Sequence, residues 1–207
     1  MELKRVVVTG IGALTPLGNT AEESWENLKA GKSGAGPITH FDASQFKTQF
    51  ACELRNFDAS SYFDHKELRH LDKFSQYALV AARAAVDDSG LDLQQEDRTR
   101  LGVVWGSGMG GVRSFEDNMI DYCRNDNTPS FTPFLIPKVI TNIAAGHIAI
   151  AFGLRGVNLT TTSACATSAS SSRASTSSRS SRSRRTSRCR SITRDPICAR
   201  PSYTSSE

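Results

Sequence analysis

The sequence predicts an α/β layered fold with a largely parallel sheet over residues 1–167, followed by a disordered Ser/Arg-rich tail over residues 168–207. Continuous apolar runs rich in β-branched residues, typical of strands buried on both faces, occur at residues 6–10, 101–105 and 157–163. Helical patterns separate these runs, and strands that alternate with helices favour a parallel sheet. The tail has too little apolar surface to offset the entropy of ordering it.

The N-terminal elements follow from local signals. After the strand at residues 6–10, a turn-rich stretch leads to a helix at residues 21–30, which has acidic residues in its first turn and ends at Gly31. Residues 33–61 are mostly loop, and residues 48–54 are predicted to form a strand.

A long helix is predicted at residues 72–89 and ends at Gly90. Its apolar side chains recur at three- and four-residue spacing and form one stripe. The members of this stripe are Phe74, Tyr77, Ala78, Ala81, Ala82, Ala85 and Val86. The many alanines predict a close, buried crossing with another element.

The second half repeats the alternation. The strand at residues 101–105 enters a glycine-rich turn at residues 106–111, and a helix is expected at residues 114–123. A further helix is predicted over residues 136–152, in which Gly146 suggests close backbone approach. The strand predicted at residues 157–163 completes the alternation.

Charge is distributed unevenly along the chain. The tail holds nine arginines and no lysine against Asp195 and Glu207, a net charge of +7. Residues 1–167 hold sixteen basic and nineteen acidic residues, a net charge of −3. A nucleic-acid-binding domain places a basic face on folded elements, and residues 1–167 show no such cluster. We therefore expect no nucleic-acid partner.

The cysteines indicate reduced thiols. They are Cys52, Cys123, Cys165, Cys189 and Cys198. An odd number with no CxxC spacing favours a cytosolic chain rather than a disulfide framework. The sequence starts without a signal peptide and contains no apolar stretch long enough to span a membrane. We expect a cytoplasmic protein without a membrane partner.

Three motifs resemble ligand sites without fitting them. Gly10-x-Gly12 follows a strand, but Thr15 breaks the dinucleotide pattern GxGxxG. Lys32-Ser33 follows a glycine, but the phosphate-loop pattern requires an earlier glycine where the chain has Glu26. The glycines at 106–111 suit close backbone approach to a ligand or subunit better than a phosphate.

No metal or cofactor site is expected. The four histidines, which are His40, His65, His70 and His147, lack metal-ligand spacing. His147 lies in an apolar helical pattern and is interpreted as a hydrogen-bonded structural residue.

Cys165 is the candidate nucleophile. It follows the third strand, in the sequence Thr-Thr-Thr-Ser-Ala-Cys-Ala-Thr at residues 160–167. A thiol at the point where a strand turns into a helix gains thiolate character from the helix N-terminus. On chemistry alone, a small buried residue is an equally good interpretation.

The tail at residues 168–207 admits three interpretations. It is an RS-type segment that binds RNA or is phosphorylated, a low-complexity linker, or an out-of-frame translation of the segment that followed Cys165. We favour the out-of-frame interpretation, because the change falls inside a structural element rather than between elements.

Several ordered motifs together resemble a bacterial 3-oxoacyl-[acyl-carrier-protein] synthase, most closely the type II condensing enzymes of fatty-acid elongation. They are Arg5-Val-Val-Val-Thr-Gly-Ile-Gly-Ala-Leu-Thr-Pro-Leu-Gly18, Gly106-Ser-Gly-Met-Gly-Gly111, Asn142-Ile-Ala-Ala-Gly-His147 and Ser163-Ala-Cys-Ala-Thr167. The resemblance covers the N-terminal half of such an enzyme, and Val157 stands where proline is more usual.

The resemblance implies a thiolase-type αβαβα fold and a two-stage Claisen condensation. Cys165 would accept an acyl chain from acyl carrier protein as a thioester, and its backbone N–H would be one donor of the oxyanion hole. Malonyl-carrier protein would then lose CO2, and its carbanion would attack the thioester. The resemblance also implies a homodimer, and it places Met109 and Phe134 near the acyl-binding region. It implies no metal and no cofactor.

The family also uses two histidines and a lysine that no position in these 207 residues matches. We therefore predict that the chain as written does not catalyse condensation, and that the sheet face it leaves uncovered favours aggregation. Two alternatives stay open: a non-catalytic binding protein with a basic disordered arm, and a polyketide-type ketosynthase. A chain-length factor is disfavoured by the presence of Cys165.

Overall fold

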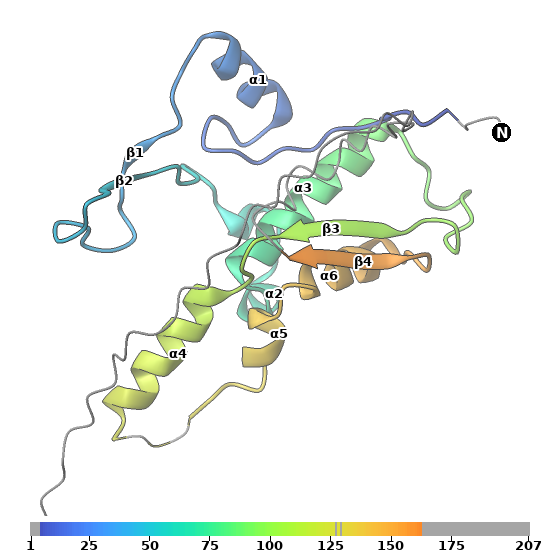
Figure 1. Ribbon diagram of the computed structural model, residues 1–207. Helices are drawn as coiled ribbons and strands as arrows, with labels where there is room; N and C mark the ends of the chain where they lie inside the picture. Colours follow the sequence, from blue (N-terminus) through green and yellow to red (C-terminus); the bar gives the residue numbers. More distant parts are fainter. Residues whose placement is uncertain (1–4, 127, 129, 163–207) are drawn as a thin grey trace, which may run out of the picture. The chain divides into compact units, whose positions relative to one another are not determined.

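The computed structural model describes residues 5–126, 128 and 130–162 (Figure 1). The helices are α1 (Ala21–Lys29), α2 (His65–His70), α3 (Lys73–Ser89), α4 (Val112–Arg124), α5 (Leu135–Val139) and α6 (Ile143–Phe152), and η1 (Ala59–Ser61) is a single 3-10 turn. The strands are β1 (Gly36–Pro37), β2 (Phe50–Ala51), β3 (Val103–Ser107) and β4 (Asn158–Thr162). The helices predicted at residues 21–30, 72–89 and 114–123 are confirmed as α1, α3 and α4, with small shifts at their ends.

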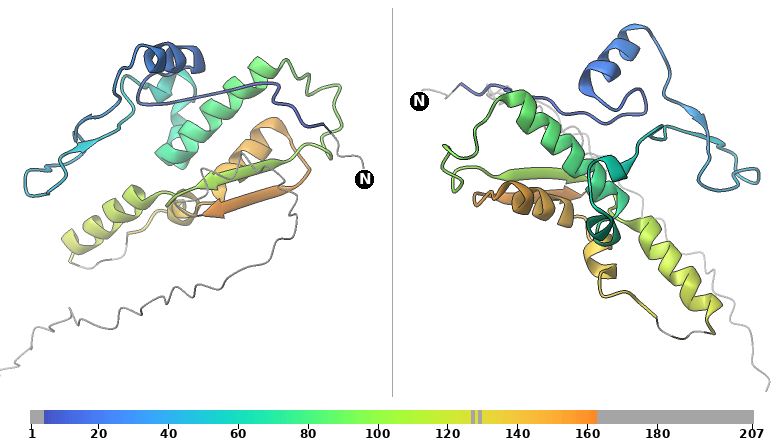
Figure 2. Two further views of the ribbon diagram at one scale, coloured as in Figure 1. Left: turned by 45° about the horizontal axis from the view of Figure 1, so that its top comes forward. Right: turned by 180° about the vertical axis from the view of Figure 1, so that it is seen from behind.

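The strands β3 and β4 pair in parallel, as predicted (Figure 1). Their register runs from Val103 opposite Asn158 to Ser107 opposite Thr162. The α6 helix lies on one face of this pair (Figure 2). On the other face Val104 is 76% exposed. The prediction that both faces of the strand are buried is therefore wrong for the described residues, because their helices cover one face only.

The core forms where α3 crosses α6. Ala78 on α3 is 1% exposed, and Ala144 and Ala145 on α6 are fully buried. Because alanine has a single methyl group, the two helix backbones can approach closely, which confirms the crossing predicted from the alanine content of α3. Gly146 differs from the prediction. A Cβ built on Gly146 meets no atom of the described residues within 4 Å, so packing among these residues does not require this glycine.

Capping residues define both ends of α3. Asp72 is the N-cap, and its carboxylate accepts the backbone N–H of Phe74 at 3.1 Å. Gly90 ends the helix in the left-handed conformation, with φ of 64°. A capping carboxylate contributes about 1 kcal/mol to helix stability, and glycine adopts the left-handed conformation without a Cβ penalty.

The predicted strand at residues 6–10 is absent. This segment has no strand pairing among the described residues, and Val6 and Val8 are 91% and 81% exposed. A strand needs a neighbour to bind its backbone N–H and C=O groups, and none of the described strands provides one. The segment instead leads to Gly10 and Gly12, which lie against α3.

The predicted helix at residues 136–152 is two helices, α5 and α6. Ile140 between them is extended, with φ of −67° and ψ of 135°. In a continuous helix the Val139 carbonyl would accept an N–H four residues later. Here it accepts the backbone N–H of Gly111 at 3.2 Å. The glycine-rich turn therefore takes up a helical hydrogen-bond acceptor, and the chain bends there.

The helix α2 lies outside the elements predicted from the sequence, although its sequence carries a local signal. Asp64 and Glu67 form a capping box, in which each side chain binds the backbone N–H of the other residue. The predicted strand at residues 48–54 shortens to β2, which pairs antiparallel with β1.

Candidate functional site

The C-terminal ends of β3 and β4 lie side by side. Ser107, the last residue of β3, pairs with Thr162, the last residue of β4. In open α/β sheets, ligands bind beyond the carboxyl ends of the strands. Here β3 continues into the glycine-rich turn at residues 106–111, and the chain after β4 leads to Cys165, which lies outside the described residues. This edge is therefore the candidate site.

The glycine-rich turn packs closely against the end of α5. A Cβ on Gly111 would lie 2.1 Å from the Lys138 carbonyl oxygen, and one on Gly110 would lie 2.4 Å from the Val139 carbonyl oxygen. Gly110 also has a φ of 69°. Both positions therefore exclude a larger residue. The sequence indicated close backbone approach to a ligand or another subunit; the close approach is present, but among the described residues the partner is the chain's own α5.

A hydrogen bond joins the start of α4 to the start of α3. The Ser114 hydroxyl, in the first turn of α4, donates to Oδ2 of Asp72 at 2.5 Å. The same carboxylate accepts the Phe74 N–H through Oδ1, and its Cγ lies close to Gly111. The N-cap of α3 thus also holds the turn that leaves β3. Sequence reasoning placed Asp72 at a helix start but did not identify Ser114.

The two residues predicted to contact the acyl chain, Met109 and Phe134, lie in the glycine-rich turn and just before α5. Met109, on the glycine-rich turn, is 74% exposed. Phe134 precedes α5 and packs on His70, with ring centroids 4.0 Å apart. Their segments meet through the Gly111–Val139 hydrogen bond. The described residues therefore connect the two segments, and both side chains remain accessible.

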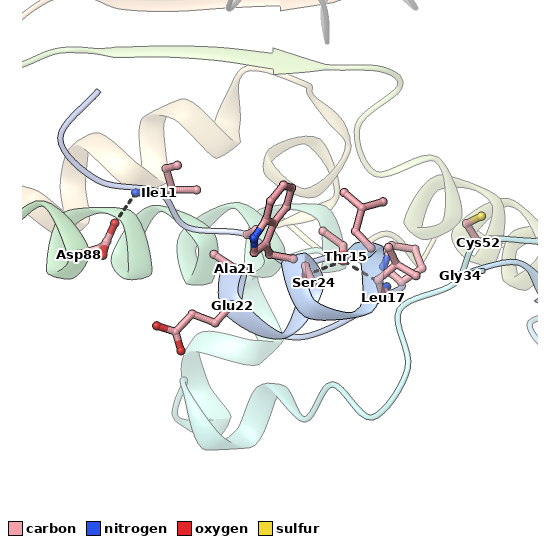
Figure 3. A pocket seen from close by; sticks show the side chains of 13 residues that line it. Ile11, Thr15, Leu17, Ala21, Glu22, Ser24, Gly34, Cys52 and Asp88 are labelled. Carbon is pink, nitrogen blue, oxygen red and sulfur yellow. Dashed lines mark hydrogen bonds between the residues drawn. The ribbon is translucent and has the colours of Figure 1, made fainter. Parts of the chain in front are cut away.

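Gly10 and Gly12 serve packing rather than a nucleotide. A Cβ on Gly12 would lie 1.9 Å from the Ala81 carbonyl oxygen, and one on Gly10 would lie 2.3 Å from that of Ala85. Beside them, a cavity of about 740 Å³ opens between the N-terminal segment and α1 (Figure 3). Its lining is mainly apolar: Ile11, Ala13, Thr15, Pro16, Leu17, Ala21, Glu22, Ser24, Trp25, Leu28, Gly34, Cys52 and Asp88. Ile11 N–H donates to Asp88 Oδ2 at 2.8 Å at its edge.

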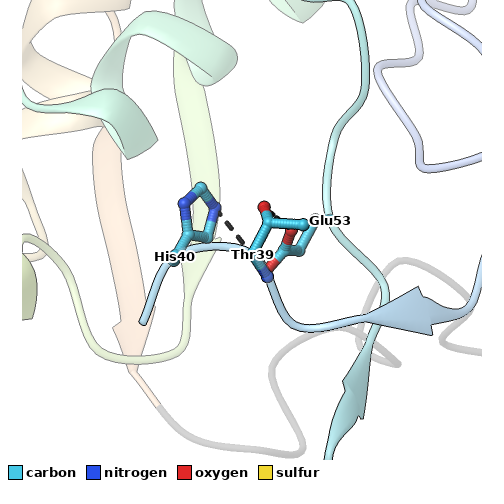
Figure 4. Close-up of polar contacts among 3 residues, drawn as sticks. All are labelled: Thr39, His40 and Glu53. Atoms are coloured by element: carbon cyan, nitrogen blue, oxygen red, sulfur yellow. Dashed lines mark hydrogen bonds and ion pairs between the residues drawn. The ribbon is translucent and has the colours of Figure 1, made fainter. Parts of the chain in front are cut away.

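A polar cluster fastens the segment after β1 to the segment after β2 (Figure 4). Thr39 donates to Glu53 through its hydroxyl at 2.6 Å and its backbone N–H at 3.1 Å. These two hydrogen bonds, with a smaller contribution from nearby His40, hold the pKa of Glu53 below its ordinary value. His40 Nε2 lies 3.9 Å from the carboxylate. The cluster holds the two segments together.

His147 is half-buried on α6, and burial lowers the pKa of its imidazole. The described residues supply no hydrogen bond to this imidazole, so the hydrogen-bonded role interpreted from the sequence stays a prediction. Across the described part of the chain, no three His, Cys, Asp or Glu side chains gather as metal ligands. Among those same residues, no helix is long and apolar enough to cross a membrane.

Comparison with known proteins relates this chain to one enzyme family. Residues 3–181 match the family model described as the N-terminal domain of beta-ketoacyl synthase. A 3-oxoacyl-[acyl-carrier-protein] synthase 2 of Coxiella burnetii is 44% identical over 167 residues, which are 81% of this chain and 40% of that protein. The enzyme of the same name from Synechocystis is 41% identical over 172 residues, 83% of this chain and 41% of that protein. The chain thus spans about two-fifths of the length of these relatives.

Solved structures of ketosynthases are also similar to this chain. A beta-ketoacyl synthase from Burkholderia phymatum has a TM-score of 0.66 at 26% identity, covering 81% of this chain and 41% of that chain. The ishigamide ketosynthase/chain length factor has a TM-score of 0.62 at 29% identity, covering 76% of this chain and 39% of that chain. The predicted thiolase-like fold is confirmed by these neighbours, and the chain belongs to the beta-ketoacyl synthase family through the N-terminal domain of that family.

Proposed function

We propose that this chain supplies the acyl-accepting thiol of a 3-oxoacyl-[acyl-carrier-protein] synthase of fatty-acid elongation, with Cys165 as the nucleophile. The observation that carries the proposal is the pairing of Ser107 with Thr162 at the C-terminal edge of β3 and β4. Cys165 follows Thr162 by three residues, so covalent geometry keeps it within about 11 Å of the strand end. This short reach supports the proposal that the thiol acts at the same edge as the glycine-rich turn.

The proposed chemistry begins with transfer of an acyl group. The Cys165 thiolate attacks the thioester carbonyl of acyl-carrier protein, the carrier thiolate leaves and takes up a proton, and the acyl chain becomes a thioester of Cys165. In a complete enzyme of this family, malonyl-carrier protein would then lose CO2, and the resulting carbanion would attack this thioester to give a 3-oxoacyl product and the free cysteine thiolate. Covalent catalysis divides one difficult carbon–carbon bond formation into easier steps.

Acyl carrier protein is the proposed partner, because the relatives that match over 167 and 172 residues of this chain are named for it. We also propose a homodimer in the complete enzyme and a cytoplasmic location. Exposed apolar side chains on the free face of the β3–β4 pair, Val104 and Leu159, support association with a second surface.

The test uses the full 207-residue chain with acyl-carrier protein as donor and intact-protein mass spectrometry as the readout. We expect one acyl group on Cys165, lost in Cys165→Ser and retained in Cys52→Ala and Cys123→Ala. We expect no 3-oxoacyl product when malonyl-carrier protein is added, because no position matches the two histidines and the lysine of the family. No acyl adduct, or an adduct on Cys52 or Cys123 alone, contradicts the proposed role of Cys165.

The alternatives are separated by the same preparation. A polyketide-type ketosynthase is less well supported, because the 41–44% identical relatives are 3-oxoacyl-[acyl-carrier-protein] synthases. A binding protein with a basic arm requires salt-dependent RNA or DNA binding that is lost on deletion of residues 168–207. Absence of binding at low salt removes that alternative.

A further inference from the structure

Three consecutive residues join α2 to α3, and each contacts a different part of the molecule. Leu71, in the middle, is buried in the core at 8% exposure, and its carbonyl accepts the side-chain amide of Gln76 at 3.2 Å. This anchors the junction to the first turn of α3. His70 and Asp72, on either side, reach outward to two other segments.

Asp72 reaches the glycine-rich turn. Its Oδ2 binds the Ser114 hydroxyl immediately after the turn, and its carboxyl carbon lies against Gly111. Its other oxygen is occupied by the N–H of Phe74. The side chain therefore has both oxygens in hydrogen bonds, one to the first turn of α3 and one to the first turn of α4.

His70 reaches the segment before α5. Its ring packs on Phe134 with centroids 4.0 Å apart and an interplanar angle of 56°. Its Nδ1 is buried and has no hydrogen-bond partner among the described residues, so the contact of His70 with Phe134 is one of ring packing. Tilted ring pairs of this kind stabilise the contact beyond the burial of their surfaces.

We infer that the His70–Leu71–Asp72 junction is a shared support that positions Met109 and Phe134 and thereby sets the acyl chain length that the site accepts. This inference rests on the proposed function for its acyl selectivity, but not for its structural part. Because both outward contacts begin at one anchored junction, the two acyl-contacting segments keep a defined spacing. His70, Asp72 and Ser114 are positioning residues in this account, since none of them is placed against the acyl chain.

The structural part is tested by amide hydrogen exchange on the full chain, without any acyl donor. Loss of a hydrogen bond to a charged group changes an opening equilibrium about tenfold. We expect Ser114→Ala to speed exchange of residues 106–111 by about tenfold, and Ser114→Thr to restore the parent rate. His70→Ala should speed exchange around Phe134, and His70→Phe should restore it. Ser60→Ala is the matched control, because Ser60 also donates to an aspartate, Asp58 at 2.7 Å, at a remote exposed site.

The selectivity part is tested by acylation of Cys165 with saturated acyl donors of increasing length. We expect Ser114→Ala and His70→Ala to broaden the length profile, while their conservative partners and Ser60→Ala keep that of the parent. Exchange at residues 106–111 that does not change in Ser114→Ala overturns the shared support. Faster exchange with an unchanged length profile overturns the role in selectivity. If the parent itself forms no thioester, the proposed function fails, and the exchange rates alone decide whether the junction is the support.

Discussion

Ser114 and Asp72 are 42 residues apart in sequence, and the Ser114 hydroxyl donates to the Asp72 carboxylate. One carboxylate therefore caps α3 and also holds the start of α4. We expect Asp72→Ala to lower the free energy of unfolding by about 2 kcal/mol, the sum of a lost N-cap and a lost charged hydrogen bond. Asp72→Asn should lose less than half of that, because asparagine still caps. Urea unfolding followed by circular dichroism measures both; equal losses contradict the capping role.

The glycine-rich turn offers a matched pair of substitutions. A Cβ on Gly111 would lie 2.1 Å from the Lys138 carbonyl oxygen, whereas one on Gly108 meets no atom within 4 Å in the part of the chain that the structure describes. We expect Gly111→Ala to destabilise the chain by about 1–3 kcal/mol, as forced overpacking does. Gly108→Ala should leave stability within about 0.5 kcal/mol of the parent. Equal midpoints of urea unfolding for the two variants would show that the turn does not press on α5.

The α3–α6 crossing can be tested on a single helix. Ala78 is 1% exposed at the crossing, whereas Ala84 on the same helix is exposed. Ala78→Leu adds three carbons to a filled site and should cost about 1–3 kcal/mol. Ala84→Leu makes the same chemical change in solvent and should be nearly neutral. Thermal unfolding compares them, and a neutral Ala78→Leu would contradict the close crossing.

Burial of His147 predicts a pH dependence of stability. Its imidazole has a lowered pKa in the folded chain, whereas the unfolded chain has the ordinary value of 6.5. As pH falls below 6.5, the unfolded state binds a proton that the folded state does not, so stability decreases until the folded pKa is passed. We expect this loss between pH 7 and 5 to be smaller in His147→Gln. Titration of His147 by NMR at or above 6.5 contradicts the prediction.

The free face of the β3–β4 pair predicts self-association. Val104 and Leu159 pair across the strands and are 76% and 56% exposed. Apolar side chains grouped on one surface favour association in water. Val104→Lys should reduce the weight-average mass measured by sedimentation equilibrium at a given protein concentration, and Val104→Ile should not. If Val104→Lys associates as strongly as the parent, another surface is responsible.

Short-range patterns in the sequence determined the elements whose stability is local. The stripe of α3, its N-cap and its C-terminal glycine all lie within the helix or beside it, and the helix formed as predicted. The strands predicted at residues 101–105 and 157–163 correspond to β3 and β4. Continuous apolar runs separated by helices favour parallel pairing. The capping box of α2, formed by Asp64 and Glu67, is a local signal of the same kind. The motifs also identified the family, and they place the nucleophile at Cys165 as a proposal, since that residue lies outside the described part of the chain.

The tertiary structure decided what depends on partners far away in the chain. Residues 6–10 have the composition of a strand, but no described strand supplies their hydrogen bonds, and Val6 stays exposed. The helical pattern at 136–152 breaks at Ile140, because the Val139 carbonyl binds Gly111 from another segment. The link between Ser114 and Asp72 likewise has no signal in local sequence. Propensity and capping act over a few residues, so they set elements; hydrogen bonds and packing between distant segments form only when the chain is folded, and they set how those elements meet at the site.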